Sequence, residues 1–106
     1  MAAAADVQIV NNGSLASLVL AGEIDVSVAP QLLTYAERLL ASAPSAIVID
    51  LADTTVLDSA GVGALVALRN AATEAGVGTV QLRPGPSNVM RVLGIVGLTD
   101  TFDEIA

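Results

Sequence analysis

Residues 47–63 read IVIDLADTTVLDSAGVG, and a change of pattern within this stretch decides the fold. The apolar, β-branched run at 47–51 is typical of a strand, the polar residues after it predict a loop, and the apolar run after Asp58 predicts a helix. Ser59 then lies in the first turn of that helix, where unpaired N–H groups and the helix dipole favour negative charge, including phosphate. The alternative is that Asp58 or Ser59 only caps the helix.

The residues before this stretch predict a hairpin and a helix. Val7–Val10 and Leu15–Leu20 read as strands, and the Asn12-Gly13 pair between them supplies the positive φ angles of a tight turn. Ser27 is predicted to cap the next helix, with Pro30 in its first turn. The apolar face of that helix repeats at helical spacing and consists of Leu32, Leu33, Ala36, Leu39 and Leu40.

The rest of the chain alternates between helices and strands. Ala46–Leu51 is almost wholly apolar, as expected of a parallel strand covered on both faces. A helix at 59–75, a strand at 78–82 and a helix at 87–96 follow. With 106 residues, 54% of them apolar, the chain is expected to form one domain over residues 1–106, with residues 1–5 frayed. The fold class is therefore α/β, a sandwich of helices and a mixed sheet that opens with a hairpin.

Three segments carry a resemblance to a known family. Residues 58–61 read DSAG, residues 20–25 read LAGEID, and residues 92–98 read VLGIVGL. In this order and spacing they resemble the anti-sigma factor antagonists, small bacterial proteins of the STAS-domain family. The resemblance covers nearly the whole chain and implies a STAS-like fold.

The resemblance implies a phosphorylation switch. The unphosphorylated antagonist would bind an anti-sigma factor that is itself a serine kinase, and so free a sigma factor for transcription. Phosphorylation of the matching serine, Ser59, would release the antagonist, and a phosphatase acting on phospho-Ser59 would reset it. Two departures stand out: Ala60 occupies a position where many relatives have a second hydroxyl, and the chain stops soon after Phe102. A final helix, often present in the family, is therefore expected to be shortened or missing.

The predicted partner surface lies around the serine. Glu23 and Asp25 are expected at the loop edge that also carries Ser59, where they could hold a basic group or simply form a charged strand end. Residues 60–68 contain no polar side chain, which predicts either a helix half buried all round or a small exposed apolar patch. Gly61 and Gly63 would permit close backbone approach by a partner, and Asp58 would cap the helix or present Ser59. The residues predicted to bind the partner are Glu23, Asp25, Asp58, Ser59, Ala60, Gly61 and Val62.

The chain lacks several residue types on which catalytic and metal-binding sites commonly depend. The chain has no histidine and no cysteine, which excludes Ser-His-Asp and Cys-His sites, zinc fingers and histidine metal sites. A phospho-acceptor receiver domain would by analogy use Asp50 with a lysine, and the chain has no lysine, so Asp50 and Asp53 are read as ordinary loop or strand-end carboxylates. We expect no enzyme activity, no cofactor and no bound metal.

The charge and the hydropathy of the chain restrict its expected cellular location and the kinds of partner that it can bind. A formal charge of −7 disfavours direct contact with nucleic acid. The longest apolar run, residues 60–68, is shorter than the roughly 18 residues of a membrane span, and the start of the sequence lacks a basic leader. A soluble, cytoplasmic protein without membrane insertion is expected.

A second interpretation remains open. The chain could be a constitutive STAS subunit of a larger assembly, such as a lipid-transport complex or a stress-sensing particle, with Ser59 acting only as a helix cap. Capture of one assembly irrespective of substitutions at Ser59 would favour this alternative.

Overall fold

A five-stranded sheet in the order β1-β2-β3-β4-β5 forms the centre of the molecule. The computed structural model describes residues 5–95 and 103–104. β1 runs antiparallel to β2, whereas the β2–β3, β3–β4 and β4–β5 pairs are parallel. The elements are β1 (Asp6–Asn12), β2 (Leu15–Ile24), α1 (Ala29–Ala41), β3 (Ala46–Leu57), α2 (Ser59–Glu74), β4 (Thr79–Arg83), α3 (Ser87–Ile95) and β5 (Asp103–Glu104).

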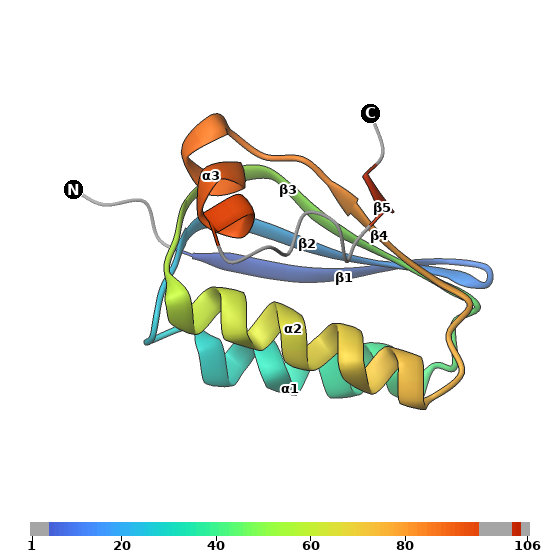
Figure 1. Cartoon of the computed structure of the whole chain (residues 1–106). Coiled ribbons are helices and arrows are strands. Elements are labelled where there is room, and N and C mark those ends of the chain that lie inside the picture. Colours follow the sequence, from blue (N-terminus) through green and yellow to red (C-terminus); the bar gives the residue numbers. More distant parts are fainter. Residues whose placement is uncertain (1–4, 96–102, 105–106) are drawn as a thin grey trace.

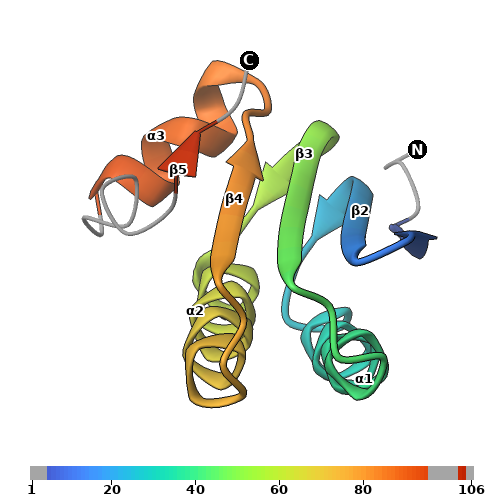
Figure 2. The same cartoon turned by 90° about the vertical axis from the view of Figure 1, so that its right-hand side faces the viewer.

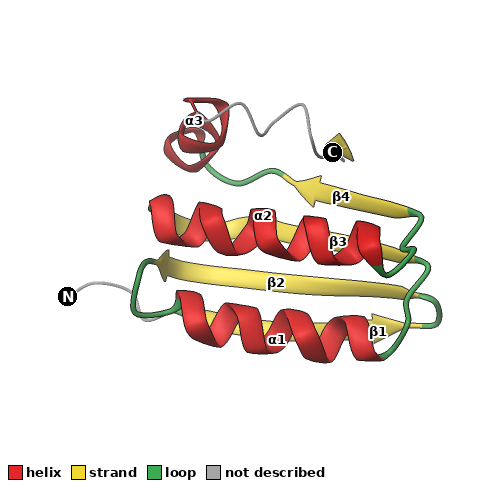
Figure 3. Cartoon of the chain, turned by 60° about the horizontal axis from the view of Figure 1, so that its bottom comes forward, coloured by secondary structure: helices red, strands yellow, loops and turns green. Residues whose placement is uncertain are grey.

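Helices α1 and α2 lie side by side along one face of the sheet (Figures 1 and 3). They are the crossover connections of the β2–β3 and β3–β4 parallel pairs, which is why both cover the same face. Helix α3 lies apart from them, on the β4 side of the sheet (Figure 2). The mixed sheet opening with a hairpin, followed by alternating helices and strands, confirms the predicted α/β fold.

The opening hairpin is confirmed, with a small correction to its turn. Asn12 is paired with Leu15, so the two residues of the loop are Gly13 and Ser14, and the Asn12-Gly13 pair does not form the turn. Gly13 has a φ of 65°, and neither neighbour has a positive φ. A single left-handed residue at the first loop position is sufficient for this turn, and glycine adopts it without a steric cost.

Strand β3 is longer than the sequence predicted, because residues 52–57 belong to it and do not form a loop. The register between β2 and β3 shifts twice, between Val19 and Ala21 and between Gly22 and Glu23, so β3 accommodates two extra residues. These irregularities replace the buried–exposed alternation of a strand by a buried residue at every third position over 51–57. The hydroxyl of the buried Thr54 donates to the Leu20 carbonyl oxygen, 2.9 Å away, where the regular pairing is interrupted.

The prediction that Ser27 caps helix α1 is wrong. Val28 occupies the N-cap position and makes no side-chain cap hydrogen bond, while Ser27 lies one residue earlier. The N–H and the hydroxyl of Ser27 both donate to Asp25 Oδ1, at 3.0 and 2.6 Å. Ser27 therefore closes a tight turn around the Asp25 carboxylate, which competes with helix capping for the same hydroxyl. Pro30 lies in the first turn, as predicted.

The core is aliphatic, as the composition predicted. Its largest fully buried side chains are Leu18, Leu20, Ile24, Leu32, Leu39, Ile47, Ile49, Leu51, Leu65, Leu68, Leu82 and Leu93. Leu33, predicted on the apolar face of α1, is instead 40% exposed. Ala5 packs against the core, and residues 1–4 lie outside the described residues, as does the end of the segment 92–98. The short β5, which the sequence did not predict, pairs with β4 through Gln81 and Leu82.

Candidate functional site

The candidate site lies where β2 and β3 end and α2 begins. Because β2 and β3 are parallel, their carboxyl ends lie at the same edge of the sheet, which is where functional residues of parallel sheets commonly gather. The N–H of Asp58 donates to the Ile24 carbonyl oxygen, 3.2 Å away, and so joins the two strand ends. Ser59 follows immediately as the first residue of α2.

Asp58 is the N-cap of α2. Its backbone is extended, with φ −99° and ψ −177°, and its Oδ1 accepts a hydrogen bond from the Gly61 N–H at 3.0 Å. The Asp58 carbonyl accepts the first helical bond, from the Val62 N–H at 2.9 Å. Of the two predicted cap residues, Asp58 is therefore confirmed, and the interpretation of Ser59 as the cap is wrong.

Ser59 is placed as predicted, in the first turn of α2, and it is exposed. Within the described part of the chain its hydroxyl makes no hydrogen bond. The cap takes up the Gly61 N–H, so the N–H groups of Ser59 and Ala60 are the ones left without an acceptor among these residues. An anion attached to Ser59 would meet unpaired donors and the positive end of the helix dipole.

Gly61 is needed where α2 packs against the strand ends. A Cβ at Gly61 would lie 2.7 Å from Leu57 Cδ1 and 3.0 Å from the Ile24 carbonyl oxygen. A Cβ at Gly63 would meet nothing within 4 Å. Gly61 and Val62 are buried, whereas Gly63 is exposed. Close approach by a partner is therefore open at Gly63, while the small size of Gly61 serves contact with the protein's own strands.

The two carboxylates predicted beside the serine flank the end of β2. Glu23 is half-buried in β2 and is paired with Val56, and Asp25 lies just after the strand. The hydrogen bond from the Ser27 hydroxyl is the main reason that the pKa of Asp25 is held below its usual value, and backbone N–H groups of the turn contribute in the same direction. Asp25 thus stabilises its own turn and remains ionised at neutral pH.

Exposed valines add an apolar component that the sequence reading missed. Val26, in the loop after β2, is 71% exposed, and Val56, two residues before the cap, is 42% exposed. A β-branched residue directly after the LAGEID segment was the available signal for the first. No such signal was available for Val56, because the pattern predicts a polar loop where the structure has the end of β3. Both valines lie close to a strand end at this edge of the sheet, and we use the name Ser59 surface for them together with Ser59, Ala60 and Gly63.

The apolar run at 60–68 is explained mostly by burial. Gly61, Val62, Ala64, Leu65 and Leu68 are buried in the core, and Ala60 and Val66 are half-buried. Only Gly63 and Ala67 are exposed in this run, so the patch predicted on α2 itself is small. The larger apolar side chains at this end of the molecule come from the loop after β2 and from the end of β3.

The other charged candidates are engaged elsewhere. Asp50 lies within β3, where its Oδ2 is 3.4 Å from Arg83 Nε and its Oδ1 accepts from the Ala52 N–H at 3.0 Å. Asp53 is exposed. Over residues 5–95 and 103–104, no three acidic side chains come together as metal ligands. No helix in the same residues has the length and apolar character needed to cross a membrane.

Comparisons with known proteins identify relatives of this fold. The family model described as "Mlab, STAS domain" matches residues 7–103. An anti-sigma factor antagonist from Mycobacterium paratuberculosis has a similar structure, with a TM-score of 0.83 and 25% identity, over 98% of this chain and 89% of that one. A search of curated proteins gave no significant match.

Two structures of SpoIIAA share the fold at lower identity. The anti-sigma factor antagonist SpoIIAA in its unphosphorylated form has a TM-score of 0.77 and 22% identity, over 97% of this chain and 89% of the other. The Bacillus cell fate determinant SpoIIAA in the phosphorylated form has a TM-score of 0.69 and 20% identity, over 97% of this chain and 92% of the other. At these identities the likeness concerns the fold.

Proposed function

The chain belongs to the STAS domain family, and we propose that it acts in the cytoplasm as an anti-sigma factor antagonist switched by phosphorylation of Ser59. In the unphosphorylated state it binds an anti-sigma factor serine kinase and frees a sigma factor. Phosphorylation releases the kinase, and a phosphatase restores the binding state. The phosphoryl chemistry belongs to these partners, so the chain itself is a non-enzymatic regulator without cofactor or metal.

The observation that carries this proposal is the position of the Ser59 hydroxyl. It is exposed at the first residue of α2, and the neighbouring Asp58 already supplies the cap. The oxygen of a serine used as a cap would accept a hydrogen bond from a backbone N–H of the helix, and here Asp58 Oδ1 accepts that bond. The similarity to an anti-sigma factor antagonist over 98% of the chain, and the fact that SpoIIAA was observed in both phosphorylation states, support the same function.

The proposed docking surface combines apolar and acidic groups. Val26 and Val56 can form a dry contact with a partner, and Glu23 and Asp25 can face a basic group at its rim. Ala60 and Gly63 have small side chains or none, which leaves room for the partner's backbone to come near Ser59 at the start of α2. Asp58, Gly61 and Val62 contribute by fixing where the helix begins, since the latter two are buried.

Phosphorylation can block this contact without unfolding the protein. A phosphoserine carries a charge of about −1.5 to −2, and placing it in a dry contact with the partner requires its desolvation. In the free protein the phosphate is tolerated, since the start of a helix stabilises an anion by about 0.3 to 1 kcal/mol. The nearby carboxylates Asp58 and Asp25 oppose part of that stabilisation. The switch therefore acts on docking and leaves the fold in place.

A pull-down from native extract tests the proposal. Wild type, Ser59→Ala and Ser59→Asp serve as baits, and mass spectrometry identifies what each retains. Capture of an ATP-binding anti-sigma kinase by wild type and Ser59→Ala, with at least tenfold less on Ser59→Asp, is the expected result. Ser87→Asp is the matched control, because Ser87 is likewise an exposed first residue of a helix, α3.

The second candidate function is a constitutive subunit of a larger assembly, such as a lipid-transport complex or a stress-sensing particle. Membership in the STAS domain family is compatible with both functions. Equal capture of one multisubunit assembly by wild type, Ser59→Ala and Ser59→Asp would replace the switch by this function. The cap at Asp58 favours the switch, because it leaves Ser59 without the structural role that the subunit interpretation gave it.

A further inference from the structure

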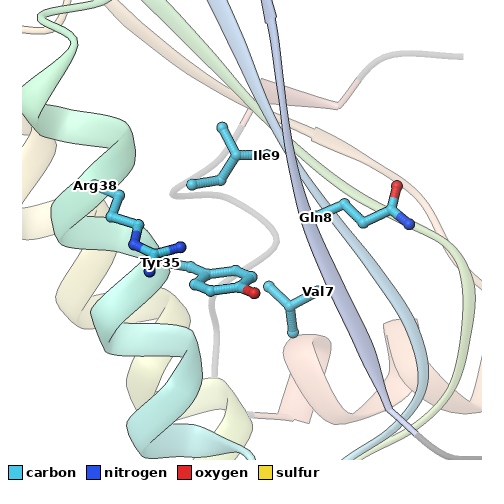
Figure 4. Close-up of a pocket in the computed structure, with 5 residues that line it drawn as sticks. All are labelled: Val7, Gln8, Ile9, Tyr35 and Arg38. Atoms are coloured by element: carbon cyan, nitrogen blue, oxygen red, sulfur yellow. The ribbon is translucent and has the colours of Figure 1, made fainter.

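A groove beside the edge strand β1 is separate from the Ser59 surface. It has a volume of about 380 Å³ and is lined by Val7, Gln8 and Ile9 from β1 and by Tyr35 and Arg38 from α1. Figure 4 shows Val7 and Ile9 pointing toward α1, with the Tyr35 ring between the strand and the helix and Gln8 on the opposite side of the strand. The groove thus has an apolar floor and one cationic wall.

Strand β1 offers a free edge next to this groove. Among the described strands, β1 pairs only with β2 and stands at the end of the sheet order. Its seven residues pair with β2 in unbroken register and contain no proline, no bulge and no lysine. Edge strands commonly carry such features to prevent pairing with another chain. At residues 7–10 the strand is uncharged, so its main chain can accept an additional strand.

The charge of the groove indicates what kind of chain would fit. Arg38 is exposed, and its Cζ lies 5.1 Å from the centroid of the Tyr35 ring, which holds the guanidinium over the groove. Within the described residues no carboxylate forms a salt bridge with Arg38. The acidic residue of β1, Asp6, accepts a hydrogen bond from the Gln8 amide at 2.9 Å, and Glu37 lies on the side of α1 that faces α2. The exposed Arg38 guanidinium is complementary to a single carboxylate on another chain, while the formal charge of −7 opposes a segment that carries many of them.

We propose that the β1 edge and the Tyr35–Arg38 groove bind an extended segment of a partner protein, carrying one acidic residue, by strand addition. The main chain of the segment pairs with β1, about 4.7 to 4.9 Å away. Side chains of the segment on the face shared by Val7 and Ile9 point toward α1, and consecutive ones are about 7 Å apart. One of them, aliphatic, contacts Tyr35, and the next, Asp or Glu, pairs with Arg38. The expected motif is an aliphatic residue and an acidic residue separated by one position.

Selection from a random dodecapeptide display library on the full chain tests the proposal. Enriched peptides are expected to contain the aliphatic–x–acidic motif. A synthetic peptide of the enriched sequence should shift the amide signals of residues 6–12 and of Tyr35 in NMR spectra. Arg38→Gln should weaken its binding about tenfold, the cost of losing one charge-assisted hydrogen bond. Replacing the acidic residue of the peptide by Gln should weaken binding to wild type equally and should have no further effect on the variant.

The matched control is Arg91→Gln, which removes one exposed charge on α3 and leaves peptide affinity unchanged. Failure to enrich any peptide, enrichment of peptides without an acidic residue, or amide shifts confined to other elements would overturn the proposal. A dimer in sedimentation that is broken by Arg38→Gln and competes with the peptide would assign the edge to a second copy of the chain. Because Ser59→Asp should not alter peptide binding, this test can fail or succeed independently of the proposed function.

Discussion

Two glycines in the same helix, two positions apart, should respond in opposite directions to the same substitution. Gly61→Ala places a methyl group 2.7 Å from Leu57 Cδ1 and 3.0 Å from the Ile24 carbonyl oxygen. The leucine methyl can rotate away, but the carbonyl belongs to the backbone, so either the start of α2 or the end of β2 must move. Overpacking of this kind costs about 1 to 3 kcal/mol.

The helix propensity works against this cost and must be subtracted. Replacing glycine by alanine inside a helix gains up to about 1 kcal/mol, and less within the first turn. The net expectation for Gly61→Ala is therefore a loss of about 1 to 2 kcal/mol in the free energy of unfolding. Gly63→Ala meets nothing within 4 Å, so it should keep the propensity gain and stabilise by about 0.5 to 1 kcal/mol.

Urea unfolding followed by far-ultraviolet circular dichroism measures both effects, because the chain has no tryptophan for fluorescence. In a separate thermal unfolding experiment, the midpoint temperature should change by about 4 to 8 °C for each kcal/mol of stability in a domain of this size. The expected pair is a lower midpoint for Gly61→Ala and a higher midpoint for Gly63→Ala. A Gly61→Ala protein as stable as wild type would refute the claim that this glycine is required by the contact between α2 and the strand ends.

Further substitutions test the cap, the bulge, the switch and the turn. Ser59→Asp should melt within about 3 °C of wild type while losing the kinase, since an anion is tolerated at a helix start; a much lower midpoint would contradict a docking block. Asp58→Ala should cost about 1 kcal/mol in urea unfolding and Asp58→Asn clearly less, because asparagine also caps; equal losses would argue against the cap. Thr54→Val should cost about 1 to 3 kcal/mol by leaving a buried β2 carbonyl unpaired, with Thr54→Ser as the control that retains the hydroxyl. In Ser27→Ala the pKa of Asp25 should rise toward its usual value in an NMR titration. The lowered pKa of Asp25 stabilises the folded protein at pH values above the pKa that Asp25 has in the unfolded chain. This stabilisation is lost as the pH falls through the pKa of Asp25 in the folded protein, so the stability difference between wild type and Ser27→Ala should vanish at low pH.

The sequence predicted those features that depend on local patterns. The hairpin, the order of helices and strands, the aliphatic core and a cap at either Asp58 or Ser59 follow from periodicity and residue type over short windows. The end of β3 could not be predicted in this way. Its two irregularities depend on the pairing with β2, and they alter the burial period over residues 51–57, so a strand resembles a polar loop in the sequence.

The remaining differences arise from contacts between residues that are separate in the sequence. Ser27 has the residue type of a cap, but the carboxylate of Asp25 is closer and takes its hydroxyl. Gly61 reads as a position for close approach by a partner, and only the packing against Leu57 and Ile24 shows that a side chain would not fit. The groove at Tyr35 and Arg38 requires α1 to lie beside β1, which no window of the sequence contains.

The way α2 is fixed is compatible with the proposed switch, in which a phosphate on Ser59 acts on docking alone. The helix start is fixed by the Asp58 cap, by the bond from the Asp58 N–H to the Ile24 carbonyl, and by the contact of Gly61 with the strand ends. None of these contacts uses the Ser59 side chain, so modification of its oxygen has no direct effect on what holds the helix. A phosphate would instead change the charge and the hydration of an exposed position between Asp58 and Ala60. A helix start that is held by these contacts, and that carries an exposed hydroxyl which none of them uses, is therefore suited to a switch that a partner recognises at the surface and that need not alter the core.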